Sequence, residues 1–327
     1  MRFIIRRLGF YVVAAWVAVT VNFFIPRAEP GNAVDTMLAK FQDIKPQALH
    51  ALEIEFGAKN QGSLIHQYWL YLGNIFHGNL GTSVIDYPAS VTSVIAGAIP
   101  YTLILIGTAT LIAFTLGTLL GVFAGWRRGG WLDQALPALT FLQATPYFFF
   151  ALLMIELFSL TWHIFPYANG FSLGLVPGWN STFILSAIDH AILPAFTIIV
   201  TSMAGWMLQM RNVMITTIGE DYVLAAQAKG LNPRRVVFTY AARNAILPNI
   251  AGFALAIGFV VAGALVMEIV FSYPGIGLLL YNAVTSNDYP LVQGIFLVIS
   301  LSVLAACLIA DVVYVIADPR TRTRSAY

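Results

Sequence analysis

Charged residues are scarce in this chain: Asp, Glu, Lys and Arg make up only 10% of its 327 residues. Soluble domains usually carry about a quarter charged residues. The mean hydropathy of +0.78 is also high. The sequence therefore predicts an integral membrane protein. The formal net charge of +2 says little by itself, so the placement of charges along the chain carries the information.

Cysteine and the motifs of soluble enzymes are also nearly absent. The one cysteine, Cys307, lies in an apolar segment, which excludes an intrachain disulfide and a cysteine-based metal site. The five histidines are scattered, and we expect no metal site. The chain has no G-x-x-x-x-G-K-[ST], H-E-x-x-H or G-x-S-x-G motif. We expect no catalytic residue, no cofactor in this chain and no nucleic-acid partner.

Long apolar runs are what the chain has in place of these features. Each run is about as long as the ~20 residues that a helix needs to cross a bilayer. We expect an all-α integral membrane protein with six transmembrane helices, the first of them uncleaved, at Leu8–Ile25, Ile99–Gly125, Leu132–Leu160, His190–Met210, Asn249–Phe271 and Leu291–Ile316.

Two features inside these runs predict details of their packing. Gly117, Gly121 and Gly125 lie four residues apart in the second run, a spacing of small residues that lets two helices approach closely in lipid. Pro137 and Pro146 are expected to kink the third run, which neighbouring helices in a bundle can accommodate.

The distribution of Lys and Arg predicts that both chain ends are cytoplasmic. Short cytoplasmic loops carry an excess of these residues. With six spans, the 17 Lys and Arg residues divide into four on the outer side, all in the first outer loop, and the remainder inside. The inner set is Arg2, Arg6, Arg7, Arg127, Arg128, Arg211, Lys229, Arg234, Arg235, Arg243, Arg320, Arg322 and Arg324.

The chain then divides into four parts. Residues 1–26 form the N-terminal tail and first span, and 27–98 are too polar to span and form a folded extracytoplasmic insert. Residues 99–316 form a transmembrane core with a cytoplasmic loop at 212–248, and 317–327 form a cytoplasmic tail. Within the insert we expect amphipathic helices at Asp43–Gly57 and Ser63–Phe76.

The stretch Thr217–Pro248 is the most polar part of the second half of the chain, and it predicts two short helices with a sharp break. Thr217 and Glu220 fit a capping box that starts a helix. Gly230 suits a left-handed residue that ends it. Asn232 can cap the second helix, with Pro233 at its first position.

The same stretch contains side chains that local stability does not explain. Arg234 and Arg235 occupy a first helical turn, where the helix dipole disfavours cations. Small residues such as Ala225 and Ala226 let another surface approach the backbone. From composition alone, an ordinary cytoplasmic loop remains an alternative to a binding surface for a partner or for lipid headgroups.

The sequence D-Y-V-L-A-A-Q-A-K-G-L followed by R-N-A-I-L-P resembles the cytoplasmic loop of permease subunits of ABC importers, in the peptide/nickel family. Leu224 stands where the general motif E-A-A-x-x-x-G has Glu, a departure usual in the peptide branch. F-S-Y-P-G-I-G, D-Y-P-L-V-Q-G, D-V-V-Y-V-I-A-D-P-R and Q-Y-W-L-Y-L-G-N-I-F-H-G-N-L-G-T-S are similar to other segments of that family, in matching order.

The resemblance implies a function and a set of partners. In this family the loop docks on a separate ATPase, so ATP and Mg belong to partner subunits. The implied partners are two ABC ATPases, a homologous second permease, an extracytoplasmic binding protein and the bacterial or archaeal plasma membrane. The implied coupling residues are Glu220, Asp221, Tyr222, Ala225, Ala226, Lys229, Gly230, Leu231, Arg234 and Arg235.

Four polar residues lie at membrane depth: Gln143, Glu156, Glu268 and Asp311. Ionisable groups there need a partner or a water-filled cavity. We expect Asp311 to pair with Tyr314 or a nearby arginine. Gln143, Glu156 and Glu268 are candidates for the substrate pathway, although both glutamates could instead extend to the membrane interface. A proton-coupled secondary transporter that uses the acids is the alternative function.

The family resemblance implies peptides as the substrate class, with oligosaccharides or nickel chelates as alternatives. In such systems the binding protein chooses the substrate, and it is a separate chain. Aromatic residues in the second outer loop, 161–189, could stack on sugars or lie at the lipid interface.

Overall fold

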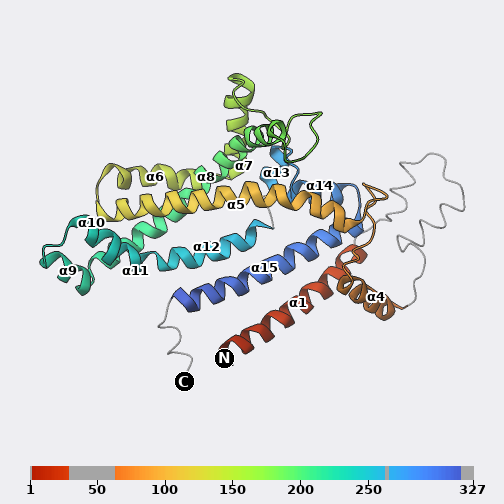
Figure 1. Ribbon diagram of the computed structural model, residues 1–327, viewed down its shortest axis with the longest axis horizontal. Coiled ribbons are helices and arrows are strands. Elements are labelled where there is room, and N and C mark those ends of the chain that lie inside the picture. The colour runs from red at the N-terminus through yellow and green to blue at the C-terminus, as the bar shows by residue number, and fades with distance from the viewer. Residues whose placement is uncertain (1, 29–62, 262–264, 318–327) are drawn as a thin grey trace, which may run out of the picture.

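In the computed structural model, which describes residues 2–28, 63–261 and 265–317, the elements are helices. The four longest are α1 (Arg2–Ala28), α5 (Val91–Trp126), α8 (Ser181–Ile218) and α15 (Tyr289–Ala317). Figure 1 shows them running roughly along one direction, with α5 beside α8 and α1 beside α15.

The pairing of α5 with α8 depends on the predicted glycine stripe. A Cβ atom on Gly117 would lie 2.6 Å from the Met203 carbonyl oxygen, and one on Gly121 would lie 2.6 Å from that of Met207. No real side chain fits at such distances, so the backbones of the two helices touch only because these positions are glycine. The predicted packing role of the stripe is confirmed.

Four helical segments among the described residues are each long and apolar enough to cross a membrane: Arg7–Ile25, Val91–Trp126, Ser181–Ile218 and Tyr289–Val312. The pair Pro233–Ala245 and Leu247–Val260, bent by 52°, adds a fifth if it forms one span. The structure thus supports a multi-pass helical membrane protein. The predicted second and fourth spans are longer than expected at both ends. Their earlier starts follow from N-caps at Ser90 and Asn180.

The predicted third span is not one kinked helix. It consists of α6 (Trp131–Ala144), then a break, then α7 (Tyr147–Met154) and a π-helical turn η1 (Ile155–Thr161). Pro137 is accommodated inside α6, whereas the chain is extended at Thr145 and Pro146. In Figure 1 the chain turns away between α6 and α7.

The predicted fifth span is also divided. It contains α12 (Leu247–Val260) and α13 (Leu265–Val270), and the outer segment that follows carries α14 (Ile276–Thr285). The expected helix at Ser63–Phe76 is confirmed as α4 (Leu64–Phe76), capped by the Ser63 side chain. The expected helix at Asp43–Gly57 lies outside the described residues.

Candidate functional site

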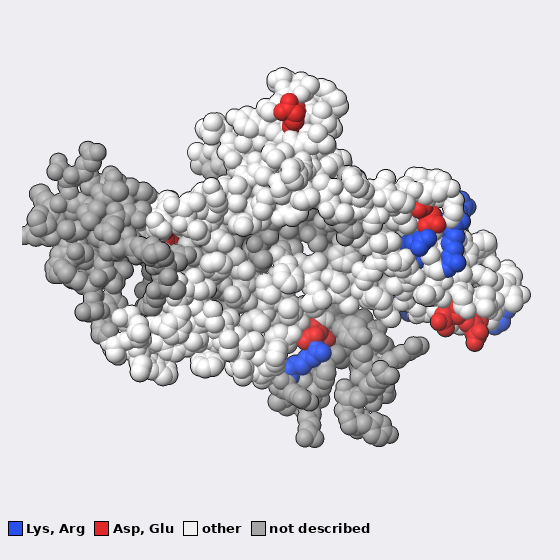
Figure 2. Space-filling model, turned by 180° about the vertical axis from the view of Figure 1, so that it is seen from behind, with Lys and Arg blue, Asp and Glu red and all other residues white. Residues whose placement is uncertain are grey.

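The predicted coupling loop forms one end of the molecule. It contains α9 (Asp221–Ala228), α10 (Pro233–Arg235), a π-helical segment η2 (Val236–Ala242) and α11 (Arg243–Ala245). Figure 1 places α9 and α10 at the C-terminal ends of α5 and α8. Figure 2 shows most of its visible charged side chains gathered at this end, with a few more at the top and in the lower middle of the view.

One side of α9 is packed against the transmembrane helices. Val223 is 0% and Ala226 3% exposed, and both belong to a hydrophobic cluster that includes Met210 and Met214 of α8 and Val122 of α5. The same cluster contains Val236, Val237, Ala241, Ala242 and Ala245 from η2 and α11. A force applied to α9 therefore reaches α5 and α8 through close packing rather than through a loose loop.

The other side of α9 and the start of α10 face outward. The predicted coupling residues with exposed side chains or backbone are Glu220, Asp221, Tyr222, Ala225, Lys229, Gly230, Arg234 and Arg235. Leu231 is half-buried. Ala226 is different, because its buried side chain packs inward and cannot itself contact a partner. Leu224, which stands where the general motif has Glu, is 47% exposed on the outward side.

The caps of this region were partly predicted. Gly230 has a φ of +71°, which confirms the left-handed end of α9. Asn232 accepts a hydrogen bond from the backbone N–H of Arg234 at 2.9 Å, which confirms the cap of α10. The predicted capping box is wrong: Thr217 lies inside α8 and its hydroxyl donates to the Val213 carbonyl, while Glu220 makes no side-chain cap bond.

A side-chain hydrogen bond that the sequence did not indicate joins the two ends of the loop. The Asn244 amide donates to the Tyr222 hydroxyl at 2.9 Å, so α9 is tied to α11 across the break. Because Tyr222 is 40% exposed, its ring remains on the outer surface. The bond fixes that ring in position on a face that a partner could contact.

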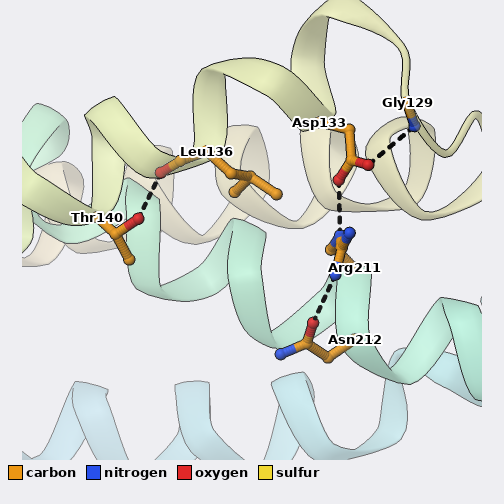
Figure 3. A network of polar contacts seen from close by, with 6 residues as sticks. All are labelled: Gly129, Asp133, Leu136, Thr140, Arg211 and Asn212. Atoms are coloured by element: carbon orange, nitrogen blue, oxygen red, sulfur yellow. Dashed lines mark hydrogen bonds and ion pairs between the residues drawn. The ribbon is translucent and has the colours of Figure 1, made fainter.

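An ion pair joins the start of α6 to α8 near the coupling loop. The Arg211 guanidinium donates from Nε to Asp133 Oδ1 at 2.8 Å, and Asp133 Oδ2 accepts from the Gly129 N–H at 2.9 Å. Figure 3 shows Arg211 reaching from α8 to Asp133 at the start of α6, with Asn212 beside it. Arg211, one of the basic residues predicted to be cytoplasmic, thus has a structural role because it joins α6 to α8.

Glu268, a predicted pathway residue, is fully buried in α13. Its Oε1 accepts from the Thr102 hydroxyl at 2.8 Å, and its Oε2 accepts from the Gly277 N–H at 2.6 Å. Thr102 in turn accepts from the Ile276 N–H at 2.8 Å. The carboxylate therefore joins α5, α13 and the first turn of α14, and it does not extend to the membrane interface. This geometry favours a structural role, and a role in the pathway stays a prediction.

The remaining membrane-depth residues have different surroundings. Glu156 is exposed in η1. Gln143 belongs to the last turn of α6, and its side chain lies outside the described residues. Asp311 forms an ion pair with Arg7 and accepts from the Tyr11 hydroxyl at 2.7 Å. The predicted pairing with an arginine is confirmed, and the partners come from α1.

Asp288 is a buried acid that sequence reasoning missed. It precedes α15 and is 0% exposed. Its Oδ2 accepts from the Ser83 hydroxyl at 2.6 Å and from the Val84 and Ile85 N–H groups at 2.7 and 3.0 Å. Its Oδ1 accepts from the Leu291 N–H. The motif D-Y-P-L-V-Q-G thereby anchors the segment before α5 to the start of α15.

Several helices long and apolar enough to cross a membrane, together with one largely exposed helix at one end, define a multi-pass membrane protein. Residues 117–323 match the family model described as binding-protein-dependent transport system inner membrane component. The chain belongs to this family, whose members are permease subunits of ABC importers.

Curated relatives match over nearly the whole chain. The di/tripeptide transport system permease protein DppB of Pseudomonas aeruginosa is 34% identical over 98% of this chain and 99% of its own length. The oligopeptide transport system permease protein AppB of Bacillus subtilis is 32% identical over 97% and 98%. The dipeptide transport system permease protein DppB of Escherichia coli K12 is 31% identical over 98% and 99%.

Proposed function

We propose that this chain forms half of the translocation pathway of an ATP-driven, binding-protein-dependent importer of peptides in a bacterial plasma membrane. The relatives named above are permeases for di-, tri- and oligopeptides, and they cover nearly the whole chain, which supports the substrate class. The proposed partners are a homologous second permease, two ABC ATPase subunits and an extracytoplasmic binding protein. ATP and Mg bind to the ATPases, and this chain is not itself an enzyme.

The observation that carries the proposal is the two-sided packing of α9. Val223 and Ala226 fasten the helix to the inner ends of α5 and α8, while Tyr222, Ala225 and Lys229 face outward. A helix packed in this way can dock on a second protein and transmit its movement to the membrane helices. The proposed six-span topology further requires that α6 with α7 and η1, and α12 with α13, each cross the membrane as broken spans.

The experiment is purification of the chain with its associated subunits, followed by ATP hydrolysis and uptake in liposomes. We expect ATPases to co-purify and to be stimulated by the loaded binding protein when its ligand is a short peptide. Stimulation by oligosaccharides or a nickel chelate instead would reassign the substrate. Uptake that follows a proton gradient without ATP would establish the secondary transporter.

A pair of variants tests the docking face itself. Ala225→Trp places a large side chain on the exposed face of α9, and we expect it to release the ATPases. Ala96→Trp adds the same side chain to an exposed position near the outer end of α5 and should retain them. Retention of the ATPases by both variants would contradict the assignment of α9.

A further inference from the structure

The break between α6 and α7 lies beside a groove in the wall of α8. The cavity has a volume of about 680 Å³, within the range of small-molecule sites. Its lining comes from the end of α6, the break, the start of α7 and one face of α8. The lining residues are Ala144, Thr145, Pro146, Tyr147, Thr201, Ser202, Gly205, Trp206 and Gln209.

The lining combines polar and apolar groups and carries no charge. Ser202 and Gln209 are exposed on α8, and neither side chain makes a hydrogen bond to any other part of the chain that the structure describes. Both belong to a helix apolar enough to cross a membrane. Polar groups at membrane depth are costly without partners, so these two need water or a ligand in the groove.

A side chain at the break adds to the hydrogen-bonding capacity of the groove. Pro146 has no N–H, so the helical hydrogen-bond ladder is interrupted at this position. Thr145 is extended, and its hydroxyl donates to the Phe141 carbonyl, which leaves the hydroxyl oxygen free to accept. Thr145 at the break, and Ser202 and Gln209 of α8, thus give one groove both donors and acceptors.

Trp206 forms a fixed wall of the groove rather than a free stacking surface. Its ring makes edge contacts with Phe114 at 5.4 Å and Phe253 at 6.5 Å between centroids. A Cβ atom on Gly252 would lie 3.2 Å from the edge of the same ring. The indole is therefore held by α5 and α12, which leaves hydrogen bonding as the main means of recognition.

We propose that this groove binds the main chain of an extended peptide, with Gln209 and Ser202 pairing with its amide groups. An uncharged lining with both donors and acceptors matches the alternating N–H and C=O groups of a peptide, and it places no demand on the charge of the cargo side chains. This inference rests on the proposed function, and it adds that the main chain is the part of the peptide that the groove recognises. Gln209 also lies two residues from Arg211, whose ion pair with Asp133 fixes α6 against α8 beside the groove.

The test uses the whole importer in liposomes with a labelled tripeptide and its analogue methylated on the central amide nitrogen. The wild type should import the methylated analogue with a KM raised about threefold to tenfold, as expected for one lost hydrogen bond. Gln209→Leu should raise the KM of the normal peptide by a similar factor. In that variant the difference between the two peptides should shrink, which a merely structural role for Gln209 would not produce.

A second pair of variants tests the groove without relying on one hydrogen bond. Gly205→Trp should fill it and lower uptake at least tenfold, whereas Ile192→Trp, on an exposed part of α8 outside the lining, should import normally. Elution of each variant as the intact complex controls for folding.

The outcomes separate the two proposals. A wild type that imports no peptide would overturn the proposed function and this inference together. A wild type that imports peptides, alongside a Gly205→Trp variant that does so equally well, would overturn the inference alone. An unchanged penalty for the methylated analogue in Gln209→Leu would do the same.

Discussion

Glu268 shows how a single buried carboxylate can hold several elements together. It accepts hydrogen bonds from Thr102 of α5 and from Gly277 at the start of α14, while belonging to α13 itself. A carboxylate near the N-terminus of a helix is also favoured by the helix dipole. The glycines of F-S-Y-P-G-I-G are needed here, because a Cβ atom on Gly277 would lie 2.7 Å from the Cα atom of Leu265.

We expect Glu268→Gln to lower the free energy of unfolding by about 1–3 kcal/mol, because an amide NH₂ would replace one oxygen that now accepts a hydrogen bond. Thermal unfolding of the purified complex measures the change. Glu156→Gln is the matched control, since Glu156 is exposed and should unfold as the wild type does. A Glu268→Gln variant of normal stability but reduced transport would instead support a role in the pathway.

At the residue scale, the sequence predicted which polar groups matter but not what they contact. Burial of an ionisable residue in an apolar run indicates a partner, and Asp311 does have an arginine partner in Arg7. That partner lies some 300 positions away in the chain, and no local pattern reports such a distance. Tyr222 and Asn244 are 22 positions apart, and they meet because α10 and η2 bring α11 back to α9.

At the scale of elements, the contact between α5 and α8 makes a sharp prediction. Gly121→Ala would place a Cβ atom 2.6 Å from the Met207 carbonyl oxygen and 2.7 Å from the Met210 Cβ, so the helices must separate. Overpacking of this kind costs about 1–3 kcal/mol. We expect a lower unfolding temperature and reduced transport.

Gly107→Ala is the control in the same helix. The new methyl group would meet Val260 at 3.9 Å, an ordinary contact, and alanine favours a helix over glycine by about 0.5–1 kcal/mol. This variant should be as stable as the wild type or slightly more so. Equal destabilisation by both substitutions would mean that close approach is not the function of the stripe.

The end of α9 makes a second prediction at this scale. Gly230 has a φ of +71° and its N–H donates to the Gln227 carbonyl at 2.9 Å. Proline is fixed near a φ of −65° and has no N–H, so Gly230→Pro must rebuild the turn after α9. We expect ATP hydrolysis without transport, because the docking helix would lose its rigid connection to η2.

Two measurements on the same preparation check this: peptide uptake and ATP hydrolysis. Gly230→Ala is the graded companion, since it keeps the N–H and loses only about 1–2 kcal/mol to the left-handed conformation. Its transport should lie between that of the wild type and that of Gly230→Pro. Normal uptake by Gly230→Pro would show that transport does not require a rigid connection between α9 and η2.

The elements also show where local patterns mislead. Thr217 and Glu220 have the spacing of a capping box, yet α8 continues through Thr217 because Gly219 ends that helix two residues later. The third run was predicted as one helix kinked at Pro137 and Pro146, whereas the structure keeps Pro137 inside α6 and breaks the helix at Thr145 and Pro146. Such breaks are tolerated where neighbouring helices cover the backbone, and only tertiary packing decides that.

At the scale of the whole molecule, two features bear on topology: where the charged side chains lie, and which distant segments of the chain pair. Figure 2 shows charged side chains gathered at the end that carries α9 and α10. Elsewhere, Arg7 forms an ion pair with Asp311. That ion pair joins the first part of α1 to the last part of α15, two helices that lie side by side in Figure 1. The positive-inside pattern predicted from the sequence that both chain ends are cytoplasmic, and the side of the membrane on which they lie stays a prediction.

The six-span topology depends on whether the broken third span crosses the membrane. Because the chain has a single cysteine, cysteine labelling can test this. In a Cys307→Ser background, Arg128→Cys lies just before α6 and Leu173→Cys follows η1, both at exposed positions. If α6, α7 and η1 together cross the membrane, a membrane-impermeant maleimide should label position 173 in intact cells and position 128 only after permeabilisation. Labelling of denatured protein controls for reactivity. Labelling of both positions from the same side would make the break a re-entrant loop, reduce the number of spans, and place the groove beside Thr145 in a wall that does not cross the membrane.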